Sequence, residues 1–159
     1  MLKMIIRIVA SAAFLVVLLT LAPHAWAQIS AGSISALNGA VTVERAGKSI
    51  PAVQGTALQV GDKLTTGPNS RVSVGLSDGS QLELNDSSIL VLTENVLNPD
   101  GSRASTKVTL LNGLVRSLVK VSPGSAPNFE VHTPNAVASA RGTMFDVSYH
   151  EGQPPPATP

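Results

Sequence analysis

The sequence predicts an all-β fold, either a compact β-sandwich or a short β-roll, built from about eight to ten short strands. Two observations support this class. Short runs in which apolar and polar residues alternate recur along the chain, and clusters of Gly, Asn, Asp and Pro separate them. No helical pattern of comparable strength follows the N-terminal segment, so we expect no substantial helix beyond it.

The N-terminal residues 1–27 have the composition of a signal peptide. Lys3 and Arg7 are basic, residues 8–21 form a mostly apolar run, and residues 25–27, Ala-Trp-Ala, fit the small-x-small cleavage pattern. We expect cleavage after Ala27 and a periplasmic or secreted mature protein without a membrane span. A membrane anchor is the alternative, but a spanning helix needs about 20 apolar residues.

Three further regions follow the cleavage site. We expect a linker over residues 28–36, one β domain over residues 37–148, and a disordered tail over residues 149–159. The tail has four prolines among its last six residues, a composition that favours an extended, mobile chain.

The mature chain is nearly neutral. The full chain has 11 basic and 10 acidic residues, and removal of Lys3 and Arg7 leaves 9 basic residues, hence a net charge of −1. Because basic clusters and aromatic side chains are scarce, we expect no binding to nucleic acid. The chain has no cysteine, which excludes disulfides and thiolate chemistry.

The first strand is predicted around Val41 and Val43, which alternate with polar residues after a glycine. Residues 55–66 continue the alternation, interrupted by a turn at Gly61-Asp62, and residues 67–70 form a second turn.

Residues 72–84 carry the strongest hairpin signal. Their apolar residues alternate with polar ones on both sides of an Asp78-Gly79 turn: Val72, Val74, Leu76, Leu82 and Leu84. A two-residue loop would put the two apolar sets on opposite faces, whereas a three-residue loop, Ser77-Asp78-Gly79, pairs Val74 with Leu82 and Val72 with Leu84. We therefore predict the three-residue loop, with Gly79 in the left-handed conformation.

Residues 89–121 predict further strands around a loop. Residues 89–92 are a short apolar run, and residues 98–102, Asn-Pro-Asp-Gly-Ser, are typical of a loop between hairpin strands. The spacing in residues 114–121 would also suit a helix. However, Val115, Val119 and Val121 share one face, and β-branched residues favour a strand.

The segment from Phe129 to Tyr149 contains every aromatic residue of the mature chain. Thr133-Pro134-Asn135 predicts a turn. In the strand that follows, alternate positions are alanines, so we expect an inner strand that a neighbour packs closely. Gly142 interrupts this strand, and Phe145 and Val147 resume the alternation through a bulge or bend.

Arg141 is the one charged residue in this small-residue strand. An unpaired buried charge is costly, so we expect a carboxylate partner, with Asp62 and Asp78 as leading candidates and Asp146 as the third. The alternative is that Arg141 contacts a ligand.

An ordered set of short motifs over residues 37–148 resembles the FecR domain. The motifs run from Gly-Ala-Val at residue 39 to Arg-Gly-Thr-x-Phe-x-Val at residue 141. The motif positions, which we expect to be structural, are Gly61, Asp62, Asp78, Gly79, Gly113, Thr133, Pro134, Arg141, Gly142, Thr143 and Phe145.

The resemblance implies an all-β exported domain of bacterial envelopes, of the kind found in membrane regulators that pass a transporter's ligand signal to a sigma factor. We expect no sigma-factor-binding segment in this chain. The family pattern usually continues into a further strand pair, so we expect an open sheet edge or a truncated relative.

We expect no catalytic, cofactor or metal site. His132 and His150 have no neighbouring nucleophile pattern, and the chain has no His-x-His or Cys pair. The function predicted is a non-catalytic interaction module that binds a protein, peptide or glycan of the envelope, in signal sensing or envelope assembly. An uncharacterised enzyme and an architectural component active only in an oligomer are the alternatives.

Overall fold

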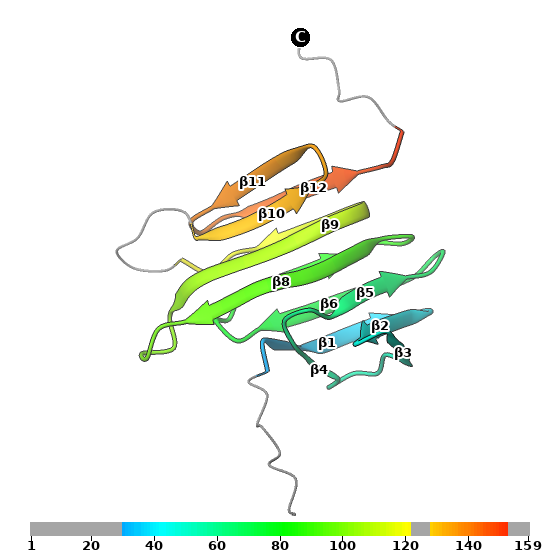
Figure 1. Ribbon diagram of the computed structural model, residues 1–159, viewed down its shortest axis with the longest axis horizontal. Helices are drawn as coiled ribbons and strands as arrows, with labels where there is room; N and C mark the ends of the chain where they lie inside the picture. The colour runs from blue at the N-terminus through cyan, green and yellow to red at the C-terminus, as the bar shows by residue number, and fades with distance from the viewer. Residues whose placement is uncertain (1–29, 122–127, 153–159) are drawn as a thin grey trace, which may run out of the picture.

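The structure, a computed structural model, describes residues 30–121 and 128–152 (Figure 1). These two ranges contain twelve β-strands and no helix: β1 (Gly32–Asn38), β2 (Val41–Arg45), β3 (Lys48–Pro51), β4 (Ala57–Leu58), β5 (Lys63–Thr66), β6 (Arg71–Leu76), β7 (Gln81–Leu84), β8 (Ile89–Leu97), β9 (Arg103–Leu118), β10 (Phe129–Thr133), β11 (Ala136–Ala140) and β12 (Met144–Tyr149). The all-β class is confirmed. The strands outnumber the expected set of about eight to ten. Elements as short as β3 and β4, with four and two residues, leave too little alternation to detect.

The long strand β9 joins the sheet into one structure. Its first part pairs with β8 and β10, and its last part pairs with β7 and β12. On one side the strand order is β3-β2-β5-β8-β9-β10-β11, which we call the β8 sheet. On the other side it is β12-β9-β7-β6-β1-β4, which we call the β7 sheet. Neighbours are antiparallel except β9 and β10, and the whole curls into a half-barrel (Figure 1).

Gly113 lies where β9 exchanges β8 for β7 as its neighbour. Asn112 is the last β9 residue that pairs with β8, and Val115 is the first that pairs with β7. Gly113 has a φ of 91°. A Cβ at this position would lie 2.1 Å from Oγ and 2.6 Å from Cα of Ser88. Glycine alone fits both this backbone conformation and this close approach, so it permits the transfer of β9 between the sheets.

The hydrophobic core lies between the two sheets, and its side chains come from both. The β8 sheet contributes Val43, Leu64, Leu90, Leu92, Val108 and Leu110, and the β7 sheet contributes Ile34, Val72, Val74, Leu82, Leu84 and Val115. Removing this apolar surface from water is the main force that holds the sheets together. All of these side chains belong to one buried cluster.

The hairpin of β6 and β7 has the predicted register. Val74 pairs with Leu82 and Val72 pairs with Leu84. The backbone N–H of Leu76 donates to the carbonyl of Ser80 at 2.8 Å, which closes a three-residue loop. Gly79 has a φ of 86°, in the left-handed region. Both the loop length and the conformation of Gly79 are confirmed.

The expected linker over residues 28–36 overlaps a strand, because β1 begins at Gly32. The β1 strand pairs with β6 and β4, and Ala31 and Ile34 are 2% and 1% exposed. Only one large apolar residue of β1 marks the buried face, so the sequence pattern is weak there. The expected tail likewise begins one residue early, since β12 includes Tyr149.

The expectation of an inner strand at residues 136–140 is wrong. Among the described residues, β11 pairs only with β10, so it forms an edge of the β8 sheet. The chain then does not continue in the same sheet beyond Gly142. It crosses to the β7 sheet, where β12 pairs with β9. The alanines of β11 provide a small inward face because Phe129 and Val131 of β10 fill the space beside them.

Candidate functional site

Asp62, one of the motif residues, holds an arginine from β2. The Nε atom of Arg45 donates to Oδ1 of Asp62 at 2.8 Å, and NH2 of Arg45 donates to Oδ2 at 2.6 Å. The backbone N–H of Gln59 also donates to Asp62 at 2.8 Å. Asp62 is 1% exposed, and its hydrogen bond with Arg45 raises the pKa of the Arg45 guanidinium. The Gly61-Asp62 turn is thereby tied to β2.

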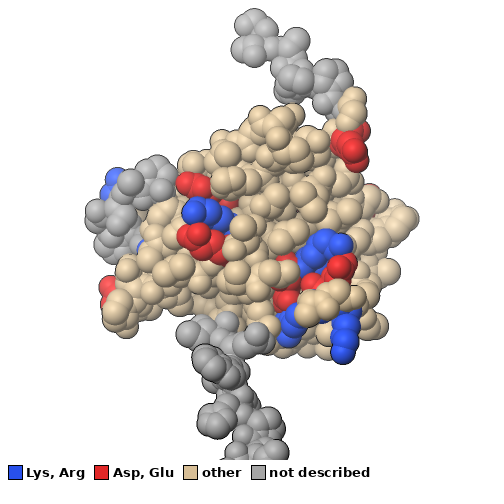
Figure 2. Space-filling model, in the orientation of Figure 1, with Lys and Arg blue, Asp and Glu red and all other residues tan. Residues whose placement is uncertain are grey.

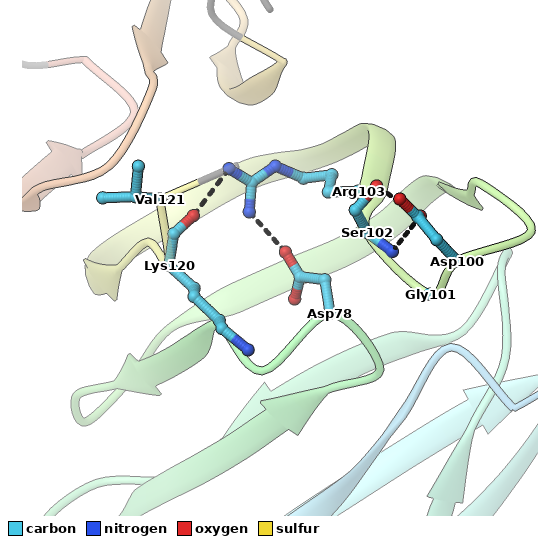
Figure 3. A pocket seen from close by; sticks show the side chains of 7 residues that line it. All are labelled: Asp78, Asp100, Gly101, Ser102, Arg103, Lys120 and Val121. Carbon is cyan, nitrogen blue, oxygen red and sulfur yellow. Dashed lines mark hydrogen bonds and ion pairs between the residues drawn. The ribbon is translucent and has the colours of Figure 1, made fainter. Parts of the chain in front are cut away.

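Asp78, in the loop between β6 and β7, forms a buried ion pair with Arg103 at the start of β9 (Figure 3). Both side chains are almost completely buried, at 2% and 1% exposure. Oδ1 of Asp78 accepts the backbone N–H of Ser80, and Oδ2 accepts its hydroxyl, both at 2.8 Å. The carboxylate thus meets several donors at once, which offsets the cost of burying its charge.

Arg103 extends this network to two more segments. Its NH2 donates to the carbonyl of Lys120 at 2.9 Å, and its Nε donates to Oδ1 of Asn128 at 2.8 Å. The guanidinium also lies 5.6 Å from the centre of the Phe129 ring, in cation–π geometry. One arginine therefore connects the β6–β7 loop, both ends of β9 and the start of β10.

A surface depression of about 310 Å³ opens beside this network (Figure 3). Its lining residues are Asp78, Asp100, Gly101, Ser102, Arg103, Lys120 and Val121. Hydrogen bonds from the Ser102 side chain and backbone lower the pKa of Asp100, which favours its ionised form. The hydroxyl of Ser102 is engaged with Asp100 at 2.6 Å, and no His or Cys lines the depression. The arrangement offers no activated nucleophile.

Arg141 does not bind any of the carboxylates expected for it, and that prediction is wrong. Arg45 holds Asp62, Arg103 holds Asp78, and Arg116 holds Asp146 through two hydrogen bonds of 2.9 Å. Arg141 lies at the bend after β11 and is exposed. In the described ranges, which include every Asp and Glu of the chain, it has no ion pair.

The remaining motif residues of this region make contacts within the fold. Thr133 accepts the backbone N–H of Ala136 at 3.1 Å in the β10–β11 turn, which also contains Pro134. A Cβ at Gly142 would lie 2.9 Å from Cα of Val121. The carbonyl of Thr143 accepts the backbone N–H of Val119 at 2.9 Å.

Phe145 packs edge-on against the ring of Phe129, with the ring centres 6.3 Å apart. This contact joins β12 of the β7 sheet to β10 of the β8 sheet. His132 lies on the outer face, with Nε2 2.7 Å from Oε2 of Glu130. Within residues 30–121 and 128–152, no group of three or more His, Cys, Asp and Glu residues is placed to hold a metal ion. The same ranges contain no helix long and apolar enough to cross a membrane.

Sequence reasoning did not find the arginines that pair with Asp62, Asp78 and Asp146. Arg45, Arg103 and Arg116 lie 17, 25 and 30 residues from their partners. No local pattern marks these pairs, because the strand order alone brings them together. The predicted cleavage site after Ala27 lies outside the described residues.

The comparisons with known proteins give one match. The family model described as FecR protein matches residues 62–154, more than half of the chain. The match begins at the Gly61-Asp62 turn and includes the residues of β5 to β12. Comparison with curated proteins and with solved structures found no match.

Proposed function

Since this chain belongs to the FecR protein family and is a signalling or envelope-related module, we propose that it acts as a non-catalytic, exported interaction domain of the bacterial cell envelope. Its partner is a protein, peptide or glycan that the domain meets in the periplasm or outside the cell.

The single observation that carries this proposal is the distribution of the charged motif residues. Asp62 and Asp78 are buried in ion pairs that hold strands together, whereas Arg141 is exposed on the surface without a carboxylate partner among the described residues. Ion pairs within the fold account for Asp62 and Asp78. A cation that the fold itself does not use is available to a partner.

The chemistry of the depression beside Arg103 supports a role without catalysis. Asp78 and Arg103 bind each other and Asp100 is bound by Ser102, so these groups stabilise the fold more readily than they would activate a substrate. The regulatory, non-enzymatic character of the family points the same way. Residues 1–27 supply the export signal on which the proposed location depends.

Export is tested by mass spectrometry of the protein recovered from the envelope fraction of expressing cells. We expect an N-terminus at Gln28, because signal peptidase accepts the Ala-Trp-Ala pattern at residues 25–27. A protein that retains Met1 in that fraction would contradict export by this route.

Binding is tested with residues 28–159 immobilised and exposed to an envelope extract, followed by titration of the purified retained component. We expect one component that saturates the domain and that Arg141→Glu weakens, with Lys48→Glu as the matched control. Lys48 is also an exposed cation without an ion pair in the described ranges, but it lies on β3. Failure to retain any saturable component would contradict the proposed function.

A further inference from the structure

We propose that the free edge of β11 receives an extended peptide segment of the binding partner as an added β-strand, and that an acidic residue of this peptide lies beside Arg141. This inference rests on the proposed function and names the chemistry of the partner. In β-strand addition, backbone hydrogen bonds supply affinity and alternate side chains supply specificity.

The four sheet edges in the described residues differ in how they are protected. An exposed strand edge invites pairing with another chain, and proteins block it with charges, prolines or very short strands. The β3 edge carries Lys48 and Pro51, the β4 edge has only two residues, and the β12 edge carries Asp146. The β11 edge, Ala-Val-Ala-Ser-Ala, has none of these features.

The β11 strand is already held in the conformation that an added strand needs. Each of its residues pairs with β10, from Ala136 opposite Thr133 to Ala140 opposite Phe129. Thr133 braces the connecting turn through its contacts with Ala136 and Asn135. Because β11 is ordered before binding, only the added peptide strand of the partner, which we call the guest strand, loses conformational entropy. Figure 1 shows β11 at the margin of the β8 sheet.

The surroundings of β11 determine which side chains the guest carries. Val137, on the outer face, is 57% exposed, and uncharged side chains cover the upper margin of Figure 2, where Figure 1 places β11. On the inner face, Ala138 of β11 is only partly buried, and so is Phe145, whose ring contacts that of Phe129 opposite Ala140. A guest strand therefore places apolar residues inward, where they cover these side chains, and uncharged residues outward.

Arg141 sets the charge of the guest. It follows directly after β11 and is exposed, so it lies beside the end of any strand added to this edge. A carboxylate at that end of the guest would be its counterion. A second copy of this chain does not supply one: if two β11 strands paired antiparallel about Ala138, Arg141 would face Asn135 of the other copy. The charge therefore favours a different, acidic peptide.

The probe for this site is a synthetic peptide, Asp-Val-Thr-Val-Thr-Val, blocked at both ends. In an antiparallel arrangement its Asp lies beside Arg141, its valines point inward and its threonines point outward. The control peptides replace Asp by Lys, or the central Val by Pro. Binding to residues 28–159 is measured by fluorescence anisotropy, and the bound segment is located by amide hydrogen exchange.

We expect saturable binding of the Asp peptide and slower exchange at Val137 and Ser139. Arg141→Glu should weaken the Asp peptide about tenfold and reverse the preference toward the Lys peptide. Ser139→Pro should abolish binding of both peptides, because proline removes a backbone donor from the edge. Lys48→Glu should change nothing. Thermal melts verify that each variant is folded. If Ser139→Pro does not fold, the test with Arg141→Glu and the Asp and Lys peptides still decides the proposal.

In the peptide assay, the proposal would be overturned by no saturable binding of the Asp peptide, or by binding that Arg141→Glu and Ser139→Pro leave unchanged. Sedimentation that shows a dimer abolished by Ser139→Pro would also overturn it, in favour of a second copy as the occupant. Capture of the envelope component by the wild-type domain and by the two edge variants, Arg141→Glu and Ser139→Pro, distinguishes failure of the β11 site from failure of the proposed function. Equal capture by the two edge variants rejects the β11 site alone, whereas no capture by the wild type rejects the function.

Discussion

At the scale of single residues, the three charged motif positions have different environments. Asp62 and Asp78 are buried and bind arginines from other strands, whereas Arg141 is exposed at a bend. Burial decides what each contributes to stability. A buried charge that loses its partner has neither a counterion nor water to solvate it, whereas an exposed charge remains hydrated.

The Arg103–Asp78 pair should dominate the electrostatic contribution to stability. Arg103→Ala leaves the carboxylate of Asp78 buried without its counterion, and should lower the free energy of unfolding by about 3–5 kcal/mol. Urea denaturation measures this loss. Arg116→Ala and Arg141→Ala are matched controls at exposed positions, and each should lower the unfolding free energy far less than Arg103→Ala does. Similar losses for all three variants would contradict the role of burial.

The Arg116–Asp146 pair should make a small contribution that depends on pH. The hydrogen bond from Arg116 holds the pKa of Asp146 below its ordinary value of 3.8 in the folded protein. A lowered folded-state pKa stabilises the fold above the unfolded-state pKa, and this stabilisation is lost as the pH falls through the lowered pKa.

The measurement is the stability difference between wild type and Asp146→Asn at neutral pH and again in acid below the lowered pKa of Asp146. We expect the wild type to be more stable at neutral pH and the difference to vanish in acid. Because both side chains are well exposed, the difference should be small. A stability difference that grows in acid would contradict a lowered pKa of Asp146 in the folded protein.

At the scale of elements, β9 depends on one glycine. It pairs with β8 and β10 before Gly113, with β12 from Gly113 onward and with β7 from Val115 onward. The backbone N–H of Leu114 donates to the hydroxyl of Ser88 at 3.0 Å, so β9 is bonded to the start of β8 at the point of transfer. Any side chain at Gly113 would occupy the position of Ser88.

Gly113→Ala should therefore cost more than an ordinary substitution at positive φ. The new Cβ collides with Ser88 and strains the backbone, and we expect a loss of about 2–5 kcal/mol in unfolding free energy. Gly47→Ala is the matched control, since Gly47 has a φ of 76° but no neighbouring atom within 4 Å of the position that a Cβ would take. It should lose only about 1 kcal/mol. Equal losses in denaturant melts would show that the contact with Ser88 does not matter.

At the scale of the whole molecule, the two sheets share one strand and one core. The buried cluster contains side chains from every strand between β1 and β11 except β3, and β9 contributes residues to both sheets. The two sheets cannot separate without exposing the apolar faces of both to water. The Arg103 network reinforces this, because it bonds both ends of β9 to neighbouring segments.

The domain should consequently unfold in a single cooperative transition. Far-UV circular dichroism reports on all strands, and the fluorescence of Tyr149 reports on β12 in the β7 sheet. The two urea curves should coincide in midpoint and slope. Separate transitions would mean that the sheets fold as independent units.

The all-β class, the family and the hairpin of β6 and β7 could be predicted from the amino-acid sequence alone. The hairpin was predictable down to its register because the apolar alternation of Val72 to Leu84 and the conformation of Gly79 are local properties, and only one loop length satisfies both. The β10–β11 turn at Pro134 was predictable for the same reason.

Which strands lie beside each other, and which charges pair, depends on the tertiary structure. Arg141 looked buried because its neighbours in sequence are small and apolar, yet β11 lies at an edge and the chain leaves the sheet at that residue. Asp62, Asp78 and Asp146 find arginines far away along the chain. A side-chain pattern specifies which face of a strand is buried, but the neighbours of that strand depend on the packing of the whole core.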